Sequence, residues 1–204
     1  MPPSKGRSGN LRADLLDSTA ALLRSRGLGF VSLRAVARRS RVSHGAPAHH
    51  FKNKAGLITA FAAESYQRLV AITDRVIARA GGDGRDRLEA VGCAYVRFAL
   101  DNPERFALMF RTELLDESDR ALRDARDTAM SRLVDVIALC SSQGYLRGRN
   151  VETVAAAAWS LTHGLAQLWL AGRLPARINE RDAHRVTREV TRLFVRAIMP
   201  DSKR

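Results

Sequence analysis

Residues 32–54 read SLRAVARRSRVSHGAPAHHFKNK. From residue 38 onward this stretch holds five Lys or Arg residues and three of the five histidines of the chain, together with a Gly-Ala-Pro run. Such a composition suits neither a buried helix nor a strand, although regular apolar spacing flanks the stretch on both sides. The stretch is therefore either a solvated loop or a surface that contacts an anionic partner.

The stretch contains two short predicted helices. Ser32 is a favourable N-cap residue for the first helix, in which Val36 would face inward. After a turn, the second helix is predicted to begin at Ser43, which places Pro47 near its fourth position. Two short helices joined by a turn of about three or four residues, after a longer first helix, are typical of a helix-turn-helix.

The charge of the chain is concentrated near this motif. The formal net charge is +13, and the first 54 residues hold eleven Lys or Arg and two Asp, a net charge of +9. This asymmetry favours a polyanionic partner at the N-terminal end, nucleic acid before a membrane, with a solvated basic face as the alternative. On duplex DNA the second short helix would lie in the major groove, where the small residues Gly45 and Ala46 permit close approach.

The rest of the chain reads as helix almost throughout, without strand alternation or an internal repeat. Apolar spacing and capping residues predict a first helix from Leu11 to Gly27 and further helices at about 54–80, 85–101, 103–110, 122–143, 150–171 and 180–198. The predicted fold class is all-α, with about nine helices. A helix-turn-helix domain covers 1–54, and the long helix links it to a larger helical body over 55–204.

Several classes of protein are disfavoured. No apolar run approaches the roughly 20 residues of a membrane span, and the polar start at 1–10 lacks the apolar core of a secretory signal. Cys93 and Cys140 stand apart without a CxxC pattern, which suits buried thiols in a reducing cytosol. The three histidines at 44, 49 and 50 lack the spacing of metal ligands. We expect neither a cofactor nor a metal site.

Three segments carry a family resemblance: GLGFVSLRAVA at 27–37, RVSHGAPAHHF at 41–51 and KNKAGL at 52–57. They resemble the DNA-binding domain of the TetR/AcrR family of bacterial transcriptional regulators. The residues that match the family pattern in order and spacing are Ser32, Val36, Ala37, Val42, Ser43, His50, Phe51, Lys54 and Leu57. Two positions depart from it, because Arg41 replaces the usual glycine of the turn and Ala48 replaces the usual tyrosine.

The resemblance implies roles for the DNA-binding residues. Ser32, His50 and Lys54 would bind phosphates, although His50 could instead pack under Phe51. Arg34 would contact a base, since bidentate Arg to guanine is the commonest specific contact. The residues implied to face the groove are Ser43, His44, Gly45, Ala46 and His49.

The C-terminal part carries a second resemblance. WSLTHG at 159–164 and NPERFALMF at 102–110 are similar to the Trp-His-Gly type of C-terminal domain in the same family. Trp159 and His163 lie four residues apart and share a helix face, which suits either a small-molecule cavity or an ordinary core histidine. The residues expected to line such a cavity are Phe98, Met109, Phe110, Met130, Leu133, Trp159 and His163.

The last two long helices are implied to form a dimer. The helix at 150–171 is apolar nearly all round and should be buried on two sides, and the family pairs it with the last helix in a four-helix bundle. The expected interface residues are Ala155, Ala158, Leu165, Leu168, Val190 and Phe194. A symmetric homodimer would present two recognition helices to a palindromic operator.

Three functions remain open. The favoured one is a cytoplasmic, nucleoid-associated bacterial regulator, a repressor released from double-stranded operator DNA by an unknown small-molecule effector. A ligand-independent architectural DNA-binding protein is the main alternative. A DNA-processing enzyme would need a nucleophile or clustered carboxylates, and the group Asp116, Glu117 and Asp119 is explained by helix capping. We therefore expect no enzymatic activity and no membrane partner.

Overall fold

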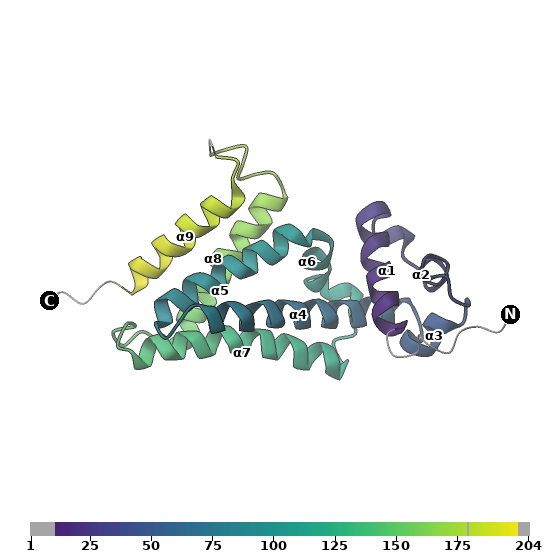
Figure 1. Cartoon of the computed structure of the whole chain (residues 1–204), viewed down its shortest axis with the longest axis horizontal. Helices are drawn as coiled ribbons and strands as arrows, with labels where there is room; N and C mark the ends of the chain where they lie inside the picture. Colours follow the sequence, from purple (N-terminus) through teal and green to yellow (C-terminus); the bar gives the residue numbers. More distant parts are fainter. Residues whose placement is uncertain (1–10, 179, 200–204) are drawn as a thin grey trace. The chain divides into compact units, whose positions relative to one another are not determined.

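The computed structural model describes residues 11–178 and 180–199, and over these residues the chain is helical without any strand (Figure 1). The start at 1–10, for which no secretory signal was expected, lies outside the described residues. The elements, in chain order, are α1 (Leu11–Arg26), η1 (Leu28–Phe30), α2 (Leu33–Ser40), α3 (Ala46–Phe51), α4 (Lys54–Arg79), α5 (Gly84–Asp101), α6 (Pro103–Met109), η2 (Thr112–Leu114), α7 (Arg120–Ser142), α8 (Val151–Leu170) and α9 (Ala183–Ile198). The predicted all-α fold with nine helices is confirmed for this part of the chain.

The chain divides into two compact units. The first runs through Tyr66 and adds Glu104–Ala125, so it holds α1 to α3, the first part of α4, α6 and the start of α7. The second comprises Gln67–Pro103 and the chain from Arg126 onward. The predicted functional boundary after residue 54 stays a prediction. None of the described helices is both long and apolar enough to cross a bilayer.

In the first unit, α1 packs against α2 and α3. Leu15 of α1, Val36 of α2 and Phe51 of α3 are almost completely buried. The Ser40 hydroxyl of α2 donates to the Ser18 hydroxyl of α1 across 2.6 Å. The apolar side of each short helix thus faces this core, which leaves their polar sides exposed to solvent.

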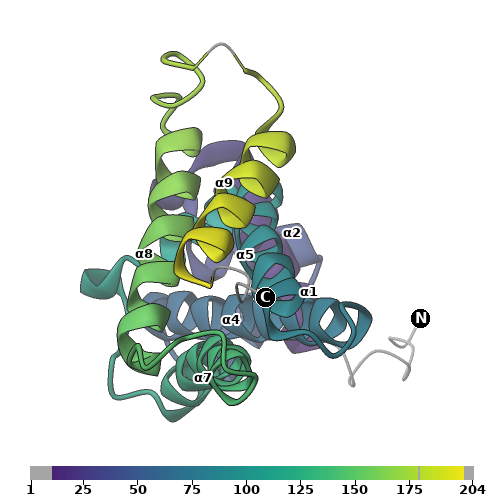
Figure 2. The ribbon, with the colours of Figure 1, turned by 90° about the vertical axis from the view of Figure 1, so that its left-hand side faces the viewer.

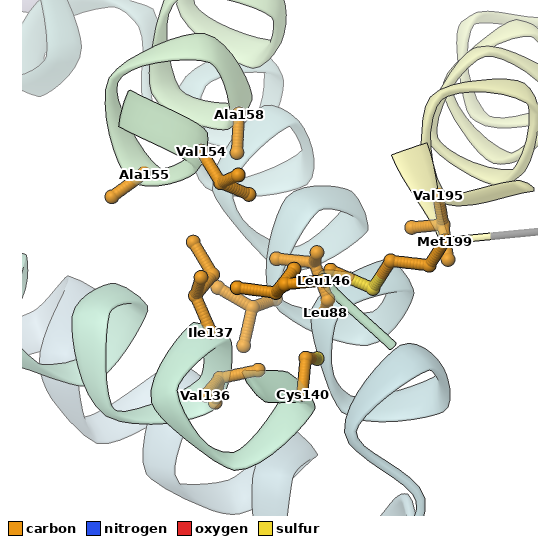
Figure 3. Packing of buried hydrophobic residues seen from close by; sticks show 11 residues of the cluster. Leu88, Val136, Ile137, Cys140, Leu146, Val154, Ala155, Ala158, Val195 and Met199 are labelled. Atoms are coloured by element: carbon orange, nitrogen blue, oxygen red, sulfur yellow. The ribbon is translucent and has the colours of Figure 1, made fainter. Parts of the chain in front are cut away.

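In the second unit, α5 packs against both α8 and α9, which also contact each other (Figure 2). Buried side chains of all three helices, of α7 and of the loop before α8 form one core cluster (Figure 3): Leu88, Val91, Val136, Ile137, Cys140, Leu146, Val154, Ala155, Ala158, Val195 and Met199. Gly92 permits the close approach of three helices. A Cβ there would lie 2.9 Å from Thr191 Cγ2 and 3.3 Å from Thr162 Cγ2.

Most helix ends lie at the capping residues that the sequence predicts. Gly27 follows α1 with a φ of 79°, and Gly144 follows α7 with the same φ. The Asn150 side chain accepts the Thr153 N–H at 2.9 Å and begins α8. Local capping chemistry therefore sets the boundaries of these helices.

The second short helix begins later than predicted. It starts at Ala46 rather than Ser43, after a turn in which the Ala46 N–H donates to the Ser43 carbonyl at 3.1 Å. Pro47 is consequently the second residue of α3 rather than the fourth. At that position an amide N–H has no partner within the helix, so proline removes no hydrogen bond.

Candidate nucleic-acid interface

Helix α2 begins at a capping serine whose hydroxyl proton remains available. Ser32 Oγ accepts the Ala35 N–H at 3.1 Å, so the N-cap predicted from the sequence is confirmed. Ser32 is exposed, and its hydroxyl can still donate to a phosphate oxygen while it caps the helix. Arg34, two residues later, is also exposed, as expected of a base-contacting side chain.

The turn between α2 and α3 contains an arginine in a left-handed conformation. Arg41 has a φ of 56° and a ψ of 42°, and the Val42 N–H donates to the Ala37 carbonyl at 3.1 Å. This conformation costs an L-residue about 1–2 kcal/mol, which glycine would avoid. The departure from the family pattern at this residue therefore places a strained but exposed cation in the turn.

Helix α3 is anchored by two buried residues and exposes the others. Pro47 and Phe51 are buried, whereas Ala48, His49 and His50 are exposed. Of the other residues expected to face the groove, Ser43, His44 and Gly45 are exposed and Ala46 is partly buried. The expected groove-facing residues thus lie on one continuous segment with its apolar anchors turned inward.

The histidine before Phe51 is not a core residue. The rings of His50 and Phe51 lie 6.0 Å apart between centroids, yet His50 is exposed.

The Phe51 ring also has a cationic neighbour from α1. The Arg12 guanidinium carbon lies 5.7 Å from the Phe51 ring centroid. Arg12, an exposed cation at the start of α1, is thereby held next to α3, a neighbour that sequence spacing does not reveal.

The start of α4 completes the segment. Asn53 Oδ1 accepts the Gly56 N–H at 2.9 Å and so caps the start of α4. Lys54 is the first residue of α4 and is exposed, with Nζ 3.5 Å from the Leu28 carbonyl oxygen. Its ammonium group adds to the positive end of the dipole of a 26-residue helix, an arrangement that attracts anions.

The cations around α3 are not neutralised within the described residues. Over that part of the chain, no ion pair involves Arg34, Arg38, Arg41, Lys52 or Lys54. A cluster of exposed, unpaired cations beside an exposed helix produces a field that attracts a polyanion. This arrangement suits the backbone of duplex DNA.

A buried arginine on α6 was missed by the sequence analysis. Arg105 is 3% exposed, and its guanidinium contacts the Glu64 carboxylate, donates to Ser65 Oγ at 3.1 Å and lies over the Phe61 ring. Asp17 of α1 lies 3.7 Å from the same guanidinium. Its partners come from α1 and α4, so no local sequence pattern could reveal the network.

The second unit contains a hydrogen-bonded aromatic cluster. Tyr95 Oη lies 2.9 Å from His163 Nδ1 and accepts the Trp159 indole N–H at 3.2 Å. Since the indole can only donate, the tyrosine hydroxyl is free to donate to Nδ1 of a neutral imidazole. Burial lowers the pKa of His163, which also favours the neutral ring. Tyr95 was not predicted as a member of this cluster, because it comes from α5.

The residues expected to line a ligand cavity are distributed over both units. Met109 and Phe110 belong to the first unit, where the Phe110 ring contacts Phe106 with 5.2 Å between centroids. The other five belong to the second unit, and Trp159 and His163 are in ring contact there, with 6.2 Å between centroids. The cavity itself stays a prediction.

The residues expected at the dimer interface differ in their exposure. Ala155, Ala158 and Leu165 are 3%, 5% and 7% exposed within a single chain, so they pack in its own interior and have little surface for a partner. Leu168 is 48% exposed, whereas Val190 and Phe194 are partly buried. Within a single chain one face of α8 packs against α5, α9 and the α7 side chains of the core cluster, so the burial of a second face stays a prediction.

Other polar groups have local explanations. Asp119 Oδ1 accepts the Leu122 N–H at 2.8 Å and caps the start of α7, whereas Asp116 Oδ1 accepts the Ser118 N–H at 3.0 Å within the turn before that helix. Burial raises the pKa of the Cys140 thiol to about 11. Within the residues that the structure covers, no group of three or more His, Cys, Asp or Glu is placed to hold a metal ion.

Comparison with known proteins supports the same assignment. Residues 15–61 match the family of bacterial regulatory proteins, tetR family, and residues 88–194, more than half of the chain, match the family of Tetracyclin repressor-like C-terminal domains. The HTH-type transcriptional regulator BetI of Burkholderia thailandensis is 36% identical over 92 residues, which are 45% of this chain and 47% of that protein. The chain thus spans about half the length of the curated relatives it matches.

Solved structures share the fold over nearly the whole chain. A protein of unknown function from Rhodococcus sp. RHA1 is 27% identical, with a TM-score of 0.85 over 97% of this chain and 100% of that one. The regulator FadR of Bacillus subtilis, in complex with stearoyl-CoA, is 13% identical, with a TM-score of 0.72 over 90% and 97% of the two chains. With its helix-turn-helix and its C-terminal helices both matched, this chain belongs to the TetR family of bacterial regulatory proteins.

Proposed function

We propose that the chain is a sequence-specific transcriptional regulator, a dimeric repressor that a small-molecule effector releases from a palindromic operator. The observation that carries this proposal is the exposed segment of α3, anchored by Pro47 and Phe51 and surrounded by unpaired cations. An anchored helix that projects polar side chains is suited to the major groove of duplex DNA. BetI, a helix-turn-helix transcriptional regulator, is similar over 92 residues.

In this proposal the exposed residues take two kinds of role. Ser32, His50 and Lys54 bind phosphates and fix the position of the helix on the duplex. The residues that contact base edges and determine sequence preference are Arg34, Ser43, His44, Gly45, Ala46 and His49.

The proposed dimer uses the surfaces of α8 and α9 that one chain leaves uncovered. On α8, Ala156, Ser160, Gly164 and Leu168 follow one another at four-residue spacing, and a Cβ at Gly164 would meet no atom within 4 Å. On α9, Leu193 is 70% exposed. Small residues permit two helices to approach closely, and the leucines supply apolar area. A two-fold dimer would then present two copies of α3 to successive grooves.

The effector would act by binding the DNA-incompetent state more tightly than the DNA-bound state. FadR of Bacillus subtilis, a protein of the same fold, holds stearoyl-CoA in its solved structure. For this chain we propose a site in the helical body that includes Trp159 and His163 and has no catalytic role. The regulator would act on the chromosome, in the cytoplasm and at the nucleoid.

The test is selection of bound duplexes from a random DNA pool, at a salt concentration that suppresses non-specific binding. Enrichment of one palindrome is expected. Salt-sensitive binding to every sequence, without enrichment, would instead favour a ligand-independent architectural protein.

The same assay tests the base-contacting residue. Arg34→Ala should cost about 1–3 kcal/mol of operator binding per half-site and relax the preference at one position of each half-site. Arg79→Ala, which removes an exposed cation at the far end of α4, is the matched control and should leave both unchanged. Unchanged affinity and preference in Arg34→Ala would exclude a base contact by this residue.

A further inference from the structure

Three non-glycine residues adopt a positive φ in the described part of the chain, and all three are cations. They are Arg41 at 56°, Lys52 at 60° and Arg147 at 50°. Arg41 follows the last residue of α2 and Lys52 follows the last residue of α3. Two of the three strained residues therefore bracket the recognition helix, one before it and one after it.

Neither side chain contributes a visible contact to the fold. Arg41 and Lys52 are both exposed, and among the described residues neither side chain forms a hydrogen bond or an ion pair. Their backbone N–H groups do close the two helices, with Lys52 donating to the Ala48 carbonyl at 2.9 Å. Glycine would make the same backbone bonds without strain. The fold alone thus gives no reason for a long cationic side chain at either position.

The backbone strain is greater at Lys52 than at Arg41. Lys52 combines its positive φ with a ψ of −57°, which lies outside the left-handed helical region that Arg41 occupies. Residues held in such conformations concentrate at functional sites, where an interaction outside the local backbone offsets their cost. For two exposed cations beside a recognition helix, that interaction is with an anion.

The dimensions of α3 indicate which anion. Its six residues span about 9 Å along the helix axis, and the major groove is about 12 Å wide. If its axis crosses the groove, a helix of this length brings its two ends close to the two phosphate backbones that form the groove walls. Arg and Lys side chains that leave from its two flanks can then reach the phosphates on either side.

We propose that Arg41 and Lys52 are two further phosphate-binding residues that bracket α3, and that their backbone strain is retained because it increases affinity for DNA. The proposal rests on the proposed function as a DNA-binding regulator. It adds two contacts to those implied by the family pattern, in which the position of Arg41 is a glycine.

The experiment measures thermal unfolding and operator binding for Arg41→Gly and Lys52→Gly at several salt concentrations. Each variant should melt higher, by about 2–4 °C, because the strain is removed. Each should bind the operator more weakly, and in a dimer the slope of log K against log salt should decrease in magnitude by about 1.8, since two phosphate contacts are lost at about 0.9 each. The ratio of wild-type to variant affinity should shrink about tenfold between 50 and 200 mM salt.

Arg147→Gly is the matched control. It removes the third cation of positive φ, which belongs to the second unit, and should leave the salt slope unchanged. Arg41→Lys and Arg41→Asn separate charge from backbone freedom, because asparagine tolerates the left-handed conformation without a charge. The lysine variant should keep the wild-type salt slope, whereas the asparagine variant should show the same decrease of the slope as Arg41→Gly.

Each result has one interpretation. If no operator is selected by the wild-type protein, the proposed function fails before this inference is tested. If the wild-type protein binds its operator but the glycine variants keep the full salt slope, the phosphate contacts are disproved. Two results would disprove the proposal that backbone strain is retained for the sake of a phosphate contact. One is a lower melting temperature in both glycine variants, and the other is an equal decrease of the salt slope in Arg41→Lys and Arg41→Asn.

Discussion

At the scale of single residues, Gly56 in the first turn of α4 has no room for a side chain. A Cβ there would lie 2.2 Å from the Phe51 carbonyl oxygen. This carbonyl also accepts the Asn53 N–H at 2.6 Å and so holds the connection between α3 and α4. The glycine is therefore required for the position of the recognition helix as well as for the start of α4.

Gly56→Ala should destabilise the protein by about 1–3 kcal/mol, the usual cost of forcing extra volume into a packed site. It should also weaken operator binding, because the Phe51 carbonyl must move. Chemical denaturation and DNA titration measure the two effects. Gly29→Ala, at a site where a Cβ meets no atom within 4 Å, should change neither, and wild-type stability in Gly56→Ala would contradict the close approach.

His163 should make stability depend on pH. Burial lowers its pKa in the folded state, whereas the unfolded chain binds a proton near the ordinary value of 6.5. Its contribution is thus present above pH 6.5 and is lost as the pH falls toward the lower folded pKa. His163→Gln should reduce the loss of unfolding free energy between pH 7.5 and 5 in denaturant titrations. Ser131→Gln, an exposed substitution on α7, is the control and should retain the wild-type loss.

At the scale of elements, α6 is held to α1 and α4 by ion pairs, of which the one to α4 is buried. Glu104 of α6 accepts from Arg24 of α1 at 2.6 Å, and Arg105 contacts Glu64 of α4. Removing one partner of a buried pair is expensive because the other charge stays buried without compensation. The Arg105–Glu64 pair, whose side chains are 3% and 18% exposed, therefore fixes the geometry of the first unit more strongly than the Arg24–Glu104 pair, whose arginine is 64% exposed.

Arg105→Ala should lower the free energy of unfolding by about 3–5 kcal/mol, the cost of breaking a buried pair. Arg111→Ala removes an exposed partner of Glu113 and should leave the free energy of unfolding nearly unchanged. Urea titration of both variants measures the difference. Equal, small losses of unfolding free energy in the two variants would show that another group or solvent stabilises the Glu64 charge once Arg105 is removed.

The elements also show how far the sequence alone leads. Helix ends follow from local chemistry, so Gly27, Ser32 and Asn150 mark them in the sequence as well as in the fold. The start of α3 was predicted too early, because serine is a residue type favoured at N-caps. The position of Pro47, which is the second residue of α3, instead determines where the helix begins. The exposure of the DNA-binding segment was foreseen for the same local reasons.

Contacts between distant segments could not be foreseen. Arg105 was predicted only as part of a short helix, yet it lies 41 residues from the glutamate that it contacts. Tyr95 and His163 are 68 residues apart. Such pairs depend on how helices pack, which apolar periodicity does not specify. The same reason explains why Ala155 and Ala158 were expected at a dimer interface although they lie inside the chain.

At the scale of the whole molecule, the predicted dimer depends on the uncovered sides of α8 and α9. Leu193 is the most exposed large apolar side chain in the described part of the chain, at 70%. A charge at that position would be buried without a partner in the proposed interface, which is strongly unfavourable.

Leu193→Glu should convert the dimer to a monomer in sedimentation equilibrium and weaken operator binding, because the two half-sites are then bound independently. Ala121→Glu, an exposed substitution on α7, is the control and should remain dimeric. A dimer that persists in Leu193→Glu would move the interface away from this part of α9.

The close packing at Gly92 has a consequence for how this chain can diverge. Because α5, α8 and α9 meet at that residue, any side chain there would occupy the space that the methyl groups of Thr162 and Thr191 now fill. An alanine at 92 would be accepted only after Thr191 had become serine or another smaller residue. In homologues, a larger residue at position 92 should therefore occur together with smaller residues at positions 162 or 191. A lineage in which position 92 was enlarged first would pass through an unstable ancestor.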